Sequence, residues 1–380
     1  MRNRKRWVNA FAISALLAAF VFGQYQSRQE YEAQVLKAFP GMKLEKLSGT
    51  DQIYTLGNRG DLLSLGSSSG YGGPLRVGVE SRNDTLQNIH ILKERETYSF
   101  LVKLMNEKFF RQFEGMRLSD SFSVPAEVEV VSGATVSSVA FVNAIRQASH
   151  ALAARTSSFK PHPVSKSWHF SWQEWGLILL ILLAAYSVFM KKRSLRYLSL
   201  GVSFVFIGFI LNASLSLSHF AVLLLGYFPS VHDHLLWWIL MGSTVGVALF
   251  MGKNIYCSGL CPFHAAQIFL NKVGGINLHF PPGVQRIIKH TSKLLLWLAL
   301  ILIFLEGNPT AGSYEPFALL FSLEGAGLQW YVLPAVLMGS LLVPDVFCRY
   351  LCPVGRSFTY LLKARQKVKG KLLTVVKKSQ

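Results

Sequence analysis

Four cysteines are the residues whose type and spacing most clearly indicate chemistry. They are the only cysteines in the chain of 380 residues, and they form two pairs with one pattern, Cys257-x-x-x-Cys261-Pro262 and Cys348-x-x-x-Cys352-Pro353. Each pair follows an apolar segment, so two membrane helices could bring four thiolates together at one membrane face. Four thiolates are the ligand set of one iron–sulfur cluster or of a structural zinc ion.

The prolines indicate that each pair lies at the start of a helix. Proline lacks an N–H group and its φ suits a helix, so Pro262 and Pro353 fit the first helical position. The preceding cysteine then lies at a helix N-terminus, which stabilises an anionic ligand, and Lys253, Arg349 and Arg356 lie nearby in sequence. We expect an iron–sulfur cluster, 4Fe–4S in preference to 2Fe–2S. Zinc and unligated thiols are the alternatives.

The composition indicates a membrane protein. Mean hydropathy is +0.32, and the charged residues are gathered in a few segments. The net charge of +19 is better explained by membrane topology than by binding of nucleic acid. We do not expect nucleic acid as a partner. Six apolar segments predict membrane-spanning helices, although 294–305 is short for a span. They are residues 7–23, 175–190, 197–217, 235–252, 294–305 and 330–347.

The basic residues predict the orientation. Segments 2–6, 191–196, 253–293 and 348–380 hold four, four, five and nine Lys or Arg residues, whereas 218–233 and 306–329 hold none. Because Lys and Arg stay on the cytoplasmic side, we expect both termini and both cysteine pairs in the cytoplasm and residues 24–174 outside the inner membrane. Thiols stay reduced in the cytoplasm, which disfavours a disulfide.

The chain is expected to contain an α+β extracytoplasmic domain and an all-α polytopic membrane domain. We interpret residues 1–23 as a membrane anchor, since no small-residue cleavage site is clear near Gly23. Residues 24–155 form the α+β domain, 156–174 a linker, 175–362 a membrane domain of five helices, and 363–380 a basic cytoplasmic tail. That tail is either solvated or lies on the anionic inner leaflet.

Alternating apolar residues and clustered glycines support the α+β interpretation. Between residues 24 and 173 the charges are mixed, with 17 Lys or Arg against 14 Asp or Glu. The patterns predict strands and helices in this domain. The strands are expected at 52–56, 62–65, 75–80, 86–94 and 128–131, and the helices at 31–38, 100–110 and 137–154.

A hydroxyl-rich turn follows the last of these strand-like runs. It reads Ser132-Gly133-Ala134-Thr135-Val136-Ser137-Ser138 and leads into a helix. Backbone N–H groups at such a turn can bind a phosphate. Ser and Thr are also ordinary helix N-caps, so the residues alone leave both interpretations open.

Ser132-Gly133-Ala134-Thr135 resembles the attachment motif of the FMN-binding domains in Na⁺-translocating quinone reductase and Rnf electron-transport subunits. The run Gly-Tyr-Gly-Gly-Pro-Leu at 70–75 resembles that family's Gly-Tyr-Gly-Gly-Pro-Ile element, and Glu96-Thr97 matches its Glu-Thr pair. The resemblance implies FMN joined by a phosphoester to Thr135 through a flavin transferase. The other residues implied to surround the cofactor are Ser132, Gly133, Ala134, Ser137, Tyr71, Gly72, Gly73, Glu96 and Thr97.

Two further features bear on this flavin site. The family usually places an aspartate six residues before the acceptor threonine, where this chain has Glu129. Gly72 and Gly73 would let backbone approach a planar ring closely. Tyr71 could stack on that ring or form part of a core edge, and Ser137 and Ser138 could be helix caps or phosphate donors.

The flavin motifs, apolar segments and paired cysteines together resemble the NosR/NirI family, which includes accessory membrane proteins of nitrous-oxide reductase and of reductive dehalogenases. We expect a short form without the ferredoxin-like C-terminal domain, similar to the dehalogenase-associated type. The resemblance implies an electron-transfer component, rather than a stand-alone catalyst, that serves an extracytoplasmic terminal reductase or its maturation factors. The alternative is a redox-sensing regulator or assembly factor.

An electron carrier between the two cofactors is also expected. The hydrocarbon core is roughly 30 Å thick, too far for one electron hop. The quinone pool or a cytoplasmic donor would therefore take part, and His219, His232, Asp233 and His234 form a candidate quinone or haem site if they are not ordinary interfacial residues. His264 is either a hydrogen-bond partner of a cluster ligand or a polar residue of the first helical turn.

Overall fold

The computed structural model describes residues 2–39, 44–47, 52–56, 61–70, 73–96, 98–132, 134–157, 159–160, 170–278, 280–323 and 327–378. The chain divides into two compact units, each built from segments that are distant in sequence. Unit 1 contains Met1–Trp168, Phe220–His234 and Ile301–Gly312. Unit 2 contains His169–His219, Leu235–Leu300 and Ser313–Gln380.

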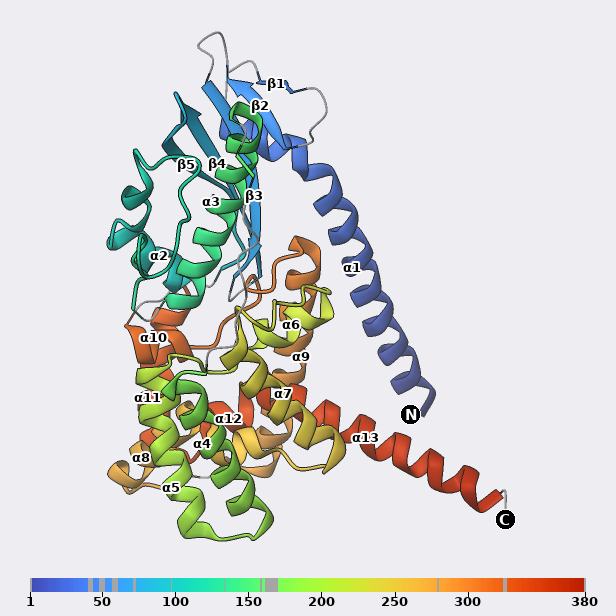
Figure 1. Cartoon of the computed structure of the whole chain (residues 1–380). Coiled ribbons are helices and arrows are strands. Elements are labelled where there is room, and N and C mark those ends of the chain that lie inside the picture. The colour runs from blue at the N-terminus through green and yellow to red at the C-terminus, as the bar shows by residue number, and fades with distance from the viewer. Residues whose placement is uncertain are drawn as a thin grey trace. The chain divides into compact units, whose positions relative to one another are not determined.

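Unit 1 is built around a five-stranded antiparallel sheet whose strands pair in chain order (Figure 1). Four of the strands confirm predicted ones, and the short first strand was not predicted. In the third and fourth strands Ser69 pairs with Pro74, so the connection between them contains the glycine-rich flavin motif. The strands are β1 (Leu44–Lys46), β2 (Ile53–Leu56), β3 (Asp61–Ser69), β4 (Pro74–Arg82) and β5 (Thr85–Lys93).

A helix covers one face of this sheet and supplies a large part of the core of unit 1. Helix α3 (Thr135–Thr156) packs on β3 and β4 (Figure 1). The approach is close, because a Cβ on Gly66 would lie 1.9 Å from the carbonyl oxygen of Ala144. Apolar side chains alternate along β4, as its sequence predicts, and all face this helix. The fully buried residues here include Leu75, Val77, Val79, Phe141, Ile145 and Ala148.

The remaining helices of unit 1 lie around the sheet. Helix α1 (Arg2–Ala38) contains both the predicted anchor and the predicted helix 31–38 in one continuous element. A second, smaller core of Phe39, Tyr54, Leu56, Leu63 and Leu65 lies near its end. Helix α2 (Tyr98–Asn106) and the 3-10 turn η2 (Phe109–Phe113) divide the region predicted as one helix at 100–110.

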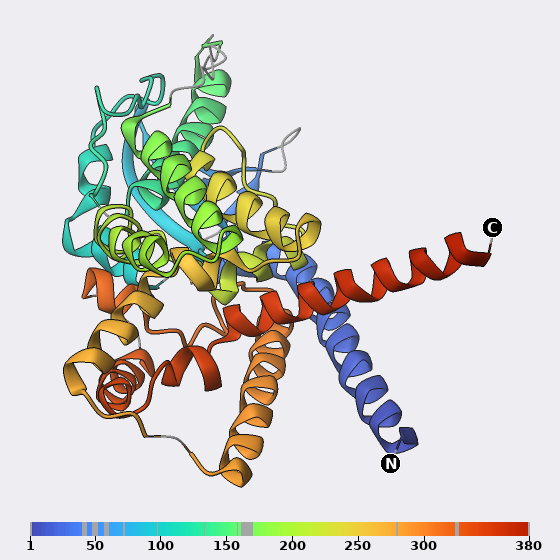
Figure 2. The same ribbon diagram turned by 90° about the horizontal axis from the view of Figure 1, so that it is seen from below.

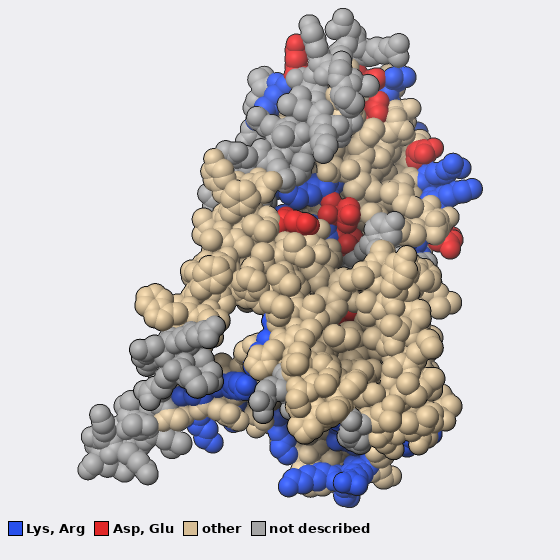
Figure 3. Space-filling model, turned by 180° about the vertical axis from the view of Figure 1, so that it is seen from behind, with Lys and Arg blue, Asp and Glu red and all other residues tan. Residues whose placement is uncertain are grey.

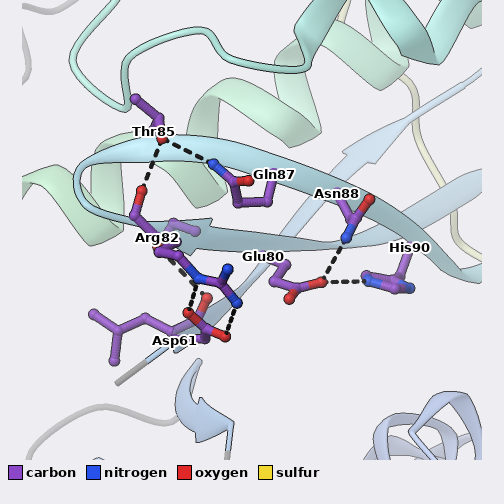
Figure 4. A network of polar contacts seen from close by, with 9 residues as sticks. Asp61, Glu80, Arg82, Thr85, Gln87, Asn88 and His90 are labelled. Carbon is purple, nitrogen blue, oxygen red and sulfur yellow. Dashed lines mark hydrogen bonds and ion pairs between the residues drawn. The ribbon is translucent and has the colours of Figure 1, made fainter. Parts of the chain in front are cut away.

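Polar pairs join neighbouring strands and fix their register (Figure 4). The Arg82 guanidinium donates two hydrogen bonds of 2.7 Å to the carboxylate of Asp61, joining β4 to β3. On the other side of β4, Glu80 accepts a 3.0 Å hydrogen bond from Asn88 and lies 3.3 Å from His90 on β5. A slip by one residue would separate both sets, so these contacts hold the sheet in one register.

The prediction of a strand at 128–131 is wrong. The structure has a loop there, in which the backbone N–H of Glu129 donates to the side-chain oxygen of Gln112 at 2.9 Å. The Gln112 amide in turn donates to the Glu129 carbonyl oxygen at 3.1 Å. One side chain thus satisfies both backbone groups that a neighbouring strand would otherwise bind, and the apolar Val128 is buried from a loop instead.

Unit 2 consists of helices and connecting loops within the described residues. The last of its helices is long and continuous, as Figures 1 and 2 show in red. Two of the elements, α6 and α9, begin in unit 2 and continue into segments of unit 1. The elements are α4 (Trp172–Phe189), α5 (Arg193–Ser203), the π-helix η3 (Phe204–Ile210), α6 (Leu217–Leu224), α7 (Leu235–Phe250), the π-helix η4 (Tyr256–Leu260), α8 (Pro262–Gly274), α9 (Pro282–Glu306), α10 (Phe317–Ser322), α11 (Gln329–Leu342), α12 (Val346–Tyr350) and α13 (Pro353–Lys378).

Four helices among the described residues are long and apolar enough to cross a membrane, which supports a membrane protein. Two further apolar helices, α7 and α11, are shorter, so the count of six spans stays a prediction. The short segment at 294–305 is part of the longer α9. The four candidate spans are Trp7–Gln26, Trp172–Phe189, Arg193–Ile210 and Pro282–Glu306.

The prediction of one helix over 197–217 is wrong at its C-terminal end. The chain leaves α5 through the π-helix η3, which ends at Ile210, and it is irregular until α6 begins at Leu217. Asn212 has a left-handed φ of 46°, which interrupts a right-handed helix. Hydropathy does not reveal such an interruption, because the segment stays apolar on both sides of it.

Candidate functional site

The four cysteines converge in unit 2, as the paired motifs predict. All four line one cavity of about 360 Å³, and none forms a disulfide. Cys257 lies in the π-helix η4, and Cys261 is the N-cap residue of α8, with Pro262 in its first turn. Cys348 lies in α12, and Cys352 directly precedes Pro353, the first residue of α13. The helix starts predicted at the two prolines are therefore confirmed.

The protein surroundings disfavour free thiolates at these positions. Burial raises the pKa of Cys257 to about 12 and the pKa of Cys261 to about 11. Burial also raises the pKa of Cys348 and of Cys352 well above the ordinary value of a thiol, and the neighbouring sulfurs add to the shift. Four ionised sulfurs would need a bound cation in this cavity to offset their charge. Metal binding would release the thiol protons.

Hydrogen-bond donors face the sulfurs from several directions. The backbone N–H of Gly355 donates to the Sγ of Cys352 at 3.3 Å, and the side-chain amide of Gln267 donates to the Sγ of Cys348 at 3.0 Å. Hydrogen bonds from the backbone of Phe263 and His264 lower the pKa of Cys261, against the larger effect of burial. Donors of this kind stabilise sulfur ligands that carry negative charge, so the surroundings suit a thiolate-bound cluster.

Side chains from other helices hold the first cysteine motif in place. The Arg196 guanidinium on α5 donates to the carbonyl oxygen of Ser258 at 2.7 Å, and the Ser203 hydroxyl donates to the carbonyl oxygen of Leu260. Gly259 packs on α4, since a Cβ there would lie 3.1 Å from the Cβ of Ala184. The turn between the two cysteines is thus fixed on two helices.

His264 joins the two cysteine motifs. Its Nδ1 lies 2.7 Å from the carbonyl oxygen of Cys257, and its Nε2 lies 3.2 Å from the Oδ1 of Asp345, just before α12. The hydrogen bond from His264 lowers the pKa of the Asp345 carboxyl group. Of the two interpretations of His264 from the sequence, the structure supports contact with a ligand residue, through its backbone rather than its sulfur.

Gly355 leaves space open beside two of the four sulfurs. A Cβ on Gly355 would lie 3.8 Å from the Sγ of Cys352 and 3.9 Å from the Sγ of Cys257, so the glycine leaves this space free. Among the described residues, no three Cys, His, Asp or Glu side chains are grouped closely enough to hold one metal ion. In a 4Fe–4S cluster each iron is bound by one cysteine.

Basic residues surround the same cavity. Arg349 and Arg356 line it, and the Arg356 guanidinium donates to the hydroxyl of Ser292 on α9. Lys253 does not line it; its ammonium group donates to the carbonyl oxygen of Val188 at 3.4 Å. Figure 3 shows that Lys and Arg side chains gather at one end of unit 2. Two of the three basic residues predicted near the cysteines thus lie at the site.

The predicted flavin acceptor is accessible at the start of a helix. Thr135 is exposed and is the first residue of α3, with Ala134 as the N-cap residue. The Ser138 hydroxyl accepts a 3.1 Å hydrogen bond from the backbone N–H of Val131 and donates to the carbonyl oxygen of Ala134 at 3.0 Å. The buried Ser138 hydroxyl therefore links both ends of the loop between Val131 and Ala134. Ser132, like Thr135, is exposed.

Glu96 and Ser137 bring the three flavin motifs together. Glu96 is buried at 2% exposure, and its Oε2 accepts a 2.8 Å hydrogen bond from the buried Ser137 hydroxyl. The Oε1 of Glu96 lies so close to Gly70 that only glycine fits at position 70, because a Cβ there would be 1.4 Å from this oxygen. The backbone N–H of Gly70 donates to the carbonyl oxygen of Gly73 at 2.8 Å and closes the turn. Tyr71, Gly72, Thr97 and Gly133 lie outside the described residues.

Two segments that follow later in the chain, Phe220–His234 and Ile301–Gly312, also belong to unit 1 and contact residues near this turn. His234 is buried and its Nε2 lies 2.9 Å from the carbonyl oxygen of Ser69 at the end of β3. The hydroxyl of Thr310 donates to the carbonyl oxygen of Glu96 at 3.4 Å. A Cβ on Gly73, whose φ is +152°, would meet the side chain of Arg95 at 3.2 Å. The flavin motif is thus held by residues from distant parts of the sequence.

The four residues of the candidate quinone site do not all fall in one unit. His219 belongs to unit 2, where it is buried and its Nδ1 accepts a 3.0 Å hydrogen bond from the backbone N–H of Ser216. His232, Asp233 and His234 belong to unit 1. A quinone site made by these residues stays a prediction.

Sequence reasoning missed several residues that line the cysteine cavity or contact one of its sulfurs. Asn254 lies a few residues before the first cysteine motif and Gln267 a few residues after it. Both have ordinary polar side chains, which indicate no particular role. Gly355 lies one turn after Cys352 and was not singled out. The available signal was helical spacing, because a position three residues after Cys352 on a helix faces the same way as the cysteine.

Comparisons with known proteins agree with both sites. A family model described as an FMN-binding domain matches residues 70–150, and one described as a 4Fe-4S binding domain matches residues 233–281 and 331–371. The first includes Thr135 and Glu96, and the second includes all four cysteines. The chain carries these two kinds of domain, which supports FMN and a 4Fe–4S cluster as cofactors.

Curated relatives cover part of the chain. Regulatory protein NosR of Pseudomonas aeruginosa is 32% identical over 136 residues, which are 33% of this chain and 19% of the relative. Protein NirI of Paracoccus denitrificans is 32% identical over 126 residues, which are 30% of this chain and 18% of the relative. Regulatory protein NosR of Stutzerimonas stutzeri is 31% identical over 126 residues, which are 31% of this chain and 17% of the relative. The chain thus spans less than a fifth of the length of these relatives, and no solved structure matches it.

Proposed function

We propose that this chain is a membrane-bound electron-transfer protein that carries electrons between a 4Fe–4S cluster and an FMN. The observation that carries the proposal is the convergence of Cys257, Cys261, Cys348 and Cys352 on one cavity, in a chain that also carries a flavin-binding domain. One chain with two redox cofactors suits transfer of electrons better than catalysis at either cofactor alone. Flavin connects one-electron and two-electron partners.

The residues around each cofactor have defined tasks in this proposal. The four cysteines would hold the cluster, and Arg349 and Arg356 would offset its negative charge from the rim of the cavity. The exposed hydroxyl of Thr135 would accept the flavin through a phosphoester formed by a flavin transferase. That bond would keep a small cofactor from diffusing away from an extracytoplasmic domain.

The basic segments support an arrangement in which the cluster lies on the cytoplasmic side and the flavin outside. Both termini would then be cytoplasmic. Electrons would enter from the quinone pool or a cytoplasmic donor and leave to an extracytoplasmic reductase or its maturation factors. Labelling of single engineered cysteines near residues 135 and 257 from one side of the membrane tests the arrangement. Labelling of both from the same side contradicts it.

Purified full-length protein tests the electron transfer itself. Visible absorption near 450 nm would follow the flavin, and EPR after reduction would follow the cluster. We expect a quinol to reduce the flavin rapidly in the wild type, seen as loss of its visible absorption. We expect the Cys257→Ser and Cys352→Ser variants to lose iron. Full iron content in both variants contradicts the four-cysteine site, and a flavin that never exchanges electrons with the cluster contradicts the function.

A second candidate function is redox sensing. The name of two relatives, "Regulatory protein NosR", favours it. In this case flavin and cluster would report redox state without sustained turnover. Repeated reduction by quinol with an added acceptor separates the two functions, because a conduit turns over many times and a sensor stops after one reduction of its cofactors.

A further inference from the structure

Gln267 lies between the two cysteine motifs and is completely buried. It belongs to α8, which follows the first motif, and its exposure is 0%. Its side chain reaches the start of α12, which carries the first cysteine of the second motif. A buried primary amide needs partners for both its oxygen and its nitrogen, because burying either without a hydrogen bond costs about 1–3 kcal/mol.

The hydrogen bonds of Gln267 fix the direction of its amide. The backbone N–H of Phe347 donates to its Oε1 at 2.9 Å, so the oxygen must face α12. The nitrogen then points to Cys348, whose Sγ it reaches at 3.0 Å. Exchanging oxygen and nitrogen would put two donors against each other at Phe347. The arrangement is therefore specific for a donor directed at this sulfur.

We infer that Gln267 is a positioning residue that sets the reduction potential of the cluster through its hydrogen bond to the Cys348 sulfur. The inference rests on the proposed function, since it requires a cluster bound by the four cysteines. Hydrogen bonds to the sulfurs are among the factors that set cluster potentials. A donor stabilises the reduced state more, because reduction adds negative charge to the sulfurs. Gln267 thus raises the potential and favours uptake of an electron.

The chain offers a graded set of variants for testing this role. Gln267→Leu removes the donor and also the acceptor for Phe347. Gln267→Glu keeps an acceptor for Phe347 but replaces the donor by a carboxylate. Asn271→Leu is the control, because Asn271 lies four residues further along α8 and its amide donates to the carbonyl oxygen of Ile276 at 3.2 Å, away from the sulfurs.

The measurement is an EPR-monitored redox titration of the full-length protein, with resonance Raman spectra in H₂O and D₂O. We expect a lower midpoint potential in Gln267→Leu, a still lower one in Gln267→Glu, and a wild-type potential in Asn271→Leu. The D₂O shift of the iron–sulfur bands should be smaller in both Gln267 variants than in the wild type. These readouts do not depend on turnover with any partner.

The outcomes separate this inference from the proposed function. A wild-type potential in Gln267→Leu at full cluster occupancy overturns the inference and leaves the function standing. If Gln267→Leu does not assemble a cluster, Gln267→Glu decides, and a wild-type potential there overturns the inference. If neither variant holds a cluster while Asn271→Leu does, Gln267 serves assembly rather than potential and the inference fails. A wild-type chain without any iron–sulfur signal overturns the function and the inference together.

Discussion

The hydroxyl of Ser137 donates a 2.8 Å hydrogen bond to the carboxylate of Glu96, although 41 residues separate them in sequence. Ser137 lies in the first turn of α3, two residues after the predicted flavin acceptor Thr135, and Glu96 follows β5. Both side chains are buried, so water cannot replace either partner. This contact, with Gly70 against the other carboxylate oxygen, joins the first turn of α3, which begins at Thr135, to the segment after β5.

Ser137→Ala should destabilise the flavin domain by about 1–3 kcal/mol, because it removes the donor to a buried carboxylate. Thermal denaturation followed by flavin fluorescence would show a lower midpoint. Ser157→Ala is the control: its hydroxyl donates to the carbonyl oxygen of Ala153, at the opposite end of α3. Equal midpoints for Ser137→Ala and the wild type would show that Glu96 does not depend on this donor.

Thr135→Ala should abolish acid-stable flavin while leaving the protein in the membrane and its iron content unchanged. Thr135→Ser should keep the flavin, because the hydroxyl is preserved at the exposed first position of α3. The measurement is flavin fluorescence of acid-precipitated protein after gel electrophoresis. Ser137 and Ser138 are fully buried and engaged, so they cannot replace the threonine without rearrangement. Acid-stable flavin in Thr135→Ala would instead indicate the exposed Ser132.

Gly355→Val should reduce the iron content of the purified protein. A Cβ at this position would lie within 3.9 Å of the sulfurs of Cys352 and Cys257, and two further methyl groups would extend into the space that a cluster needs. Gly370→Val on the same helix is the matched control, because a Cβ there meets nothing within 4 Å. Iron per protein, measured in both variants, should fall only in the first. Equal iron in the two would place the cluster away from Gly355.

The sequence predicts the convergence of the four cysteines better than it predicts the surroundings of this site. The cysteine motifs with Pro262 and Pro353 specify both ligand spacing and a helix start, and the structure has both. Alternation predicts β4 because a sheet with one buried face requires it. The run 128–131 also looks like a strand, but Gln112 satisfies the backbone of Glu129 from a distant position. Sequence periodicity contains no information about such a partner.

The residues around the cysteines could not be predicted from the sequence either, because their roles depend on contacts with distant residues. Gln267 matters because its buried amide reaches Cys348 and Phe347, which lie about 80 residues further along the chain. Its residue type alone would suit any helix surface. The interruption of the helix after Ile210 is likewise set by backbone geometry rather than hydropathy. The convergence of the four cysteines can therefore be predicted from local spacing, whereas the groups that contact them require the tertiary structure.

His219 should make the stability of unit 2 depend on pH. It is buried on α6, where its Nδ1 accepts from the backbone N–H of Ser216 and its ring stacks on Trp237 with centroids 6.1 Å apart. Burial lowers the pKa of His219 to about 4. As the pH is lowered, this histidine takes up a proton near pH 6.5 in the unfolded chain, and only at a lower pH in the folded chain.

Stability from this group should therefore be complete above about pH 6.5 and should fall as the pH is lowered toward 4, because the unfolded state then binds the extra proton. The loss would be on the order of 3 kcal/mol at the acid end, since each pKa unit corresponds to about 1.4 kcal/mol. In His219→Gln, whose amide oxygen can still accept from Ser216, the thermal midpoint should vary less over this range. His232→Gln, at an exposed histidine, is the control. If His219→Gln and the wild type lose stability in parallel between pH 6.5 and 4, His219 is not the group responsible.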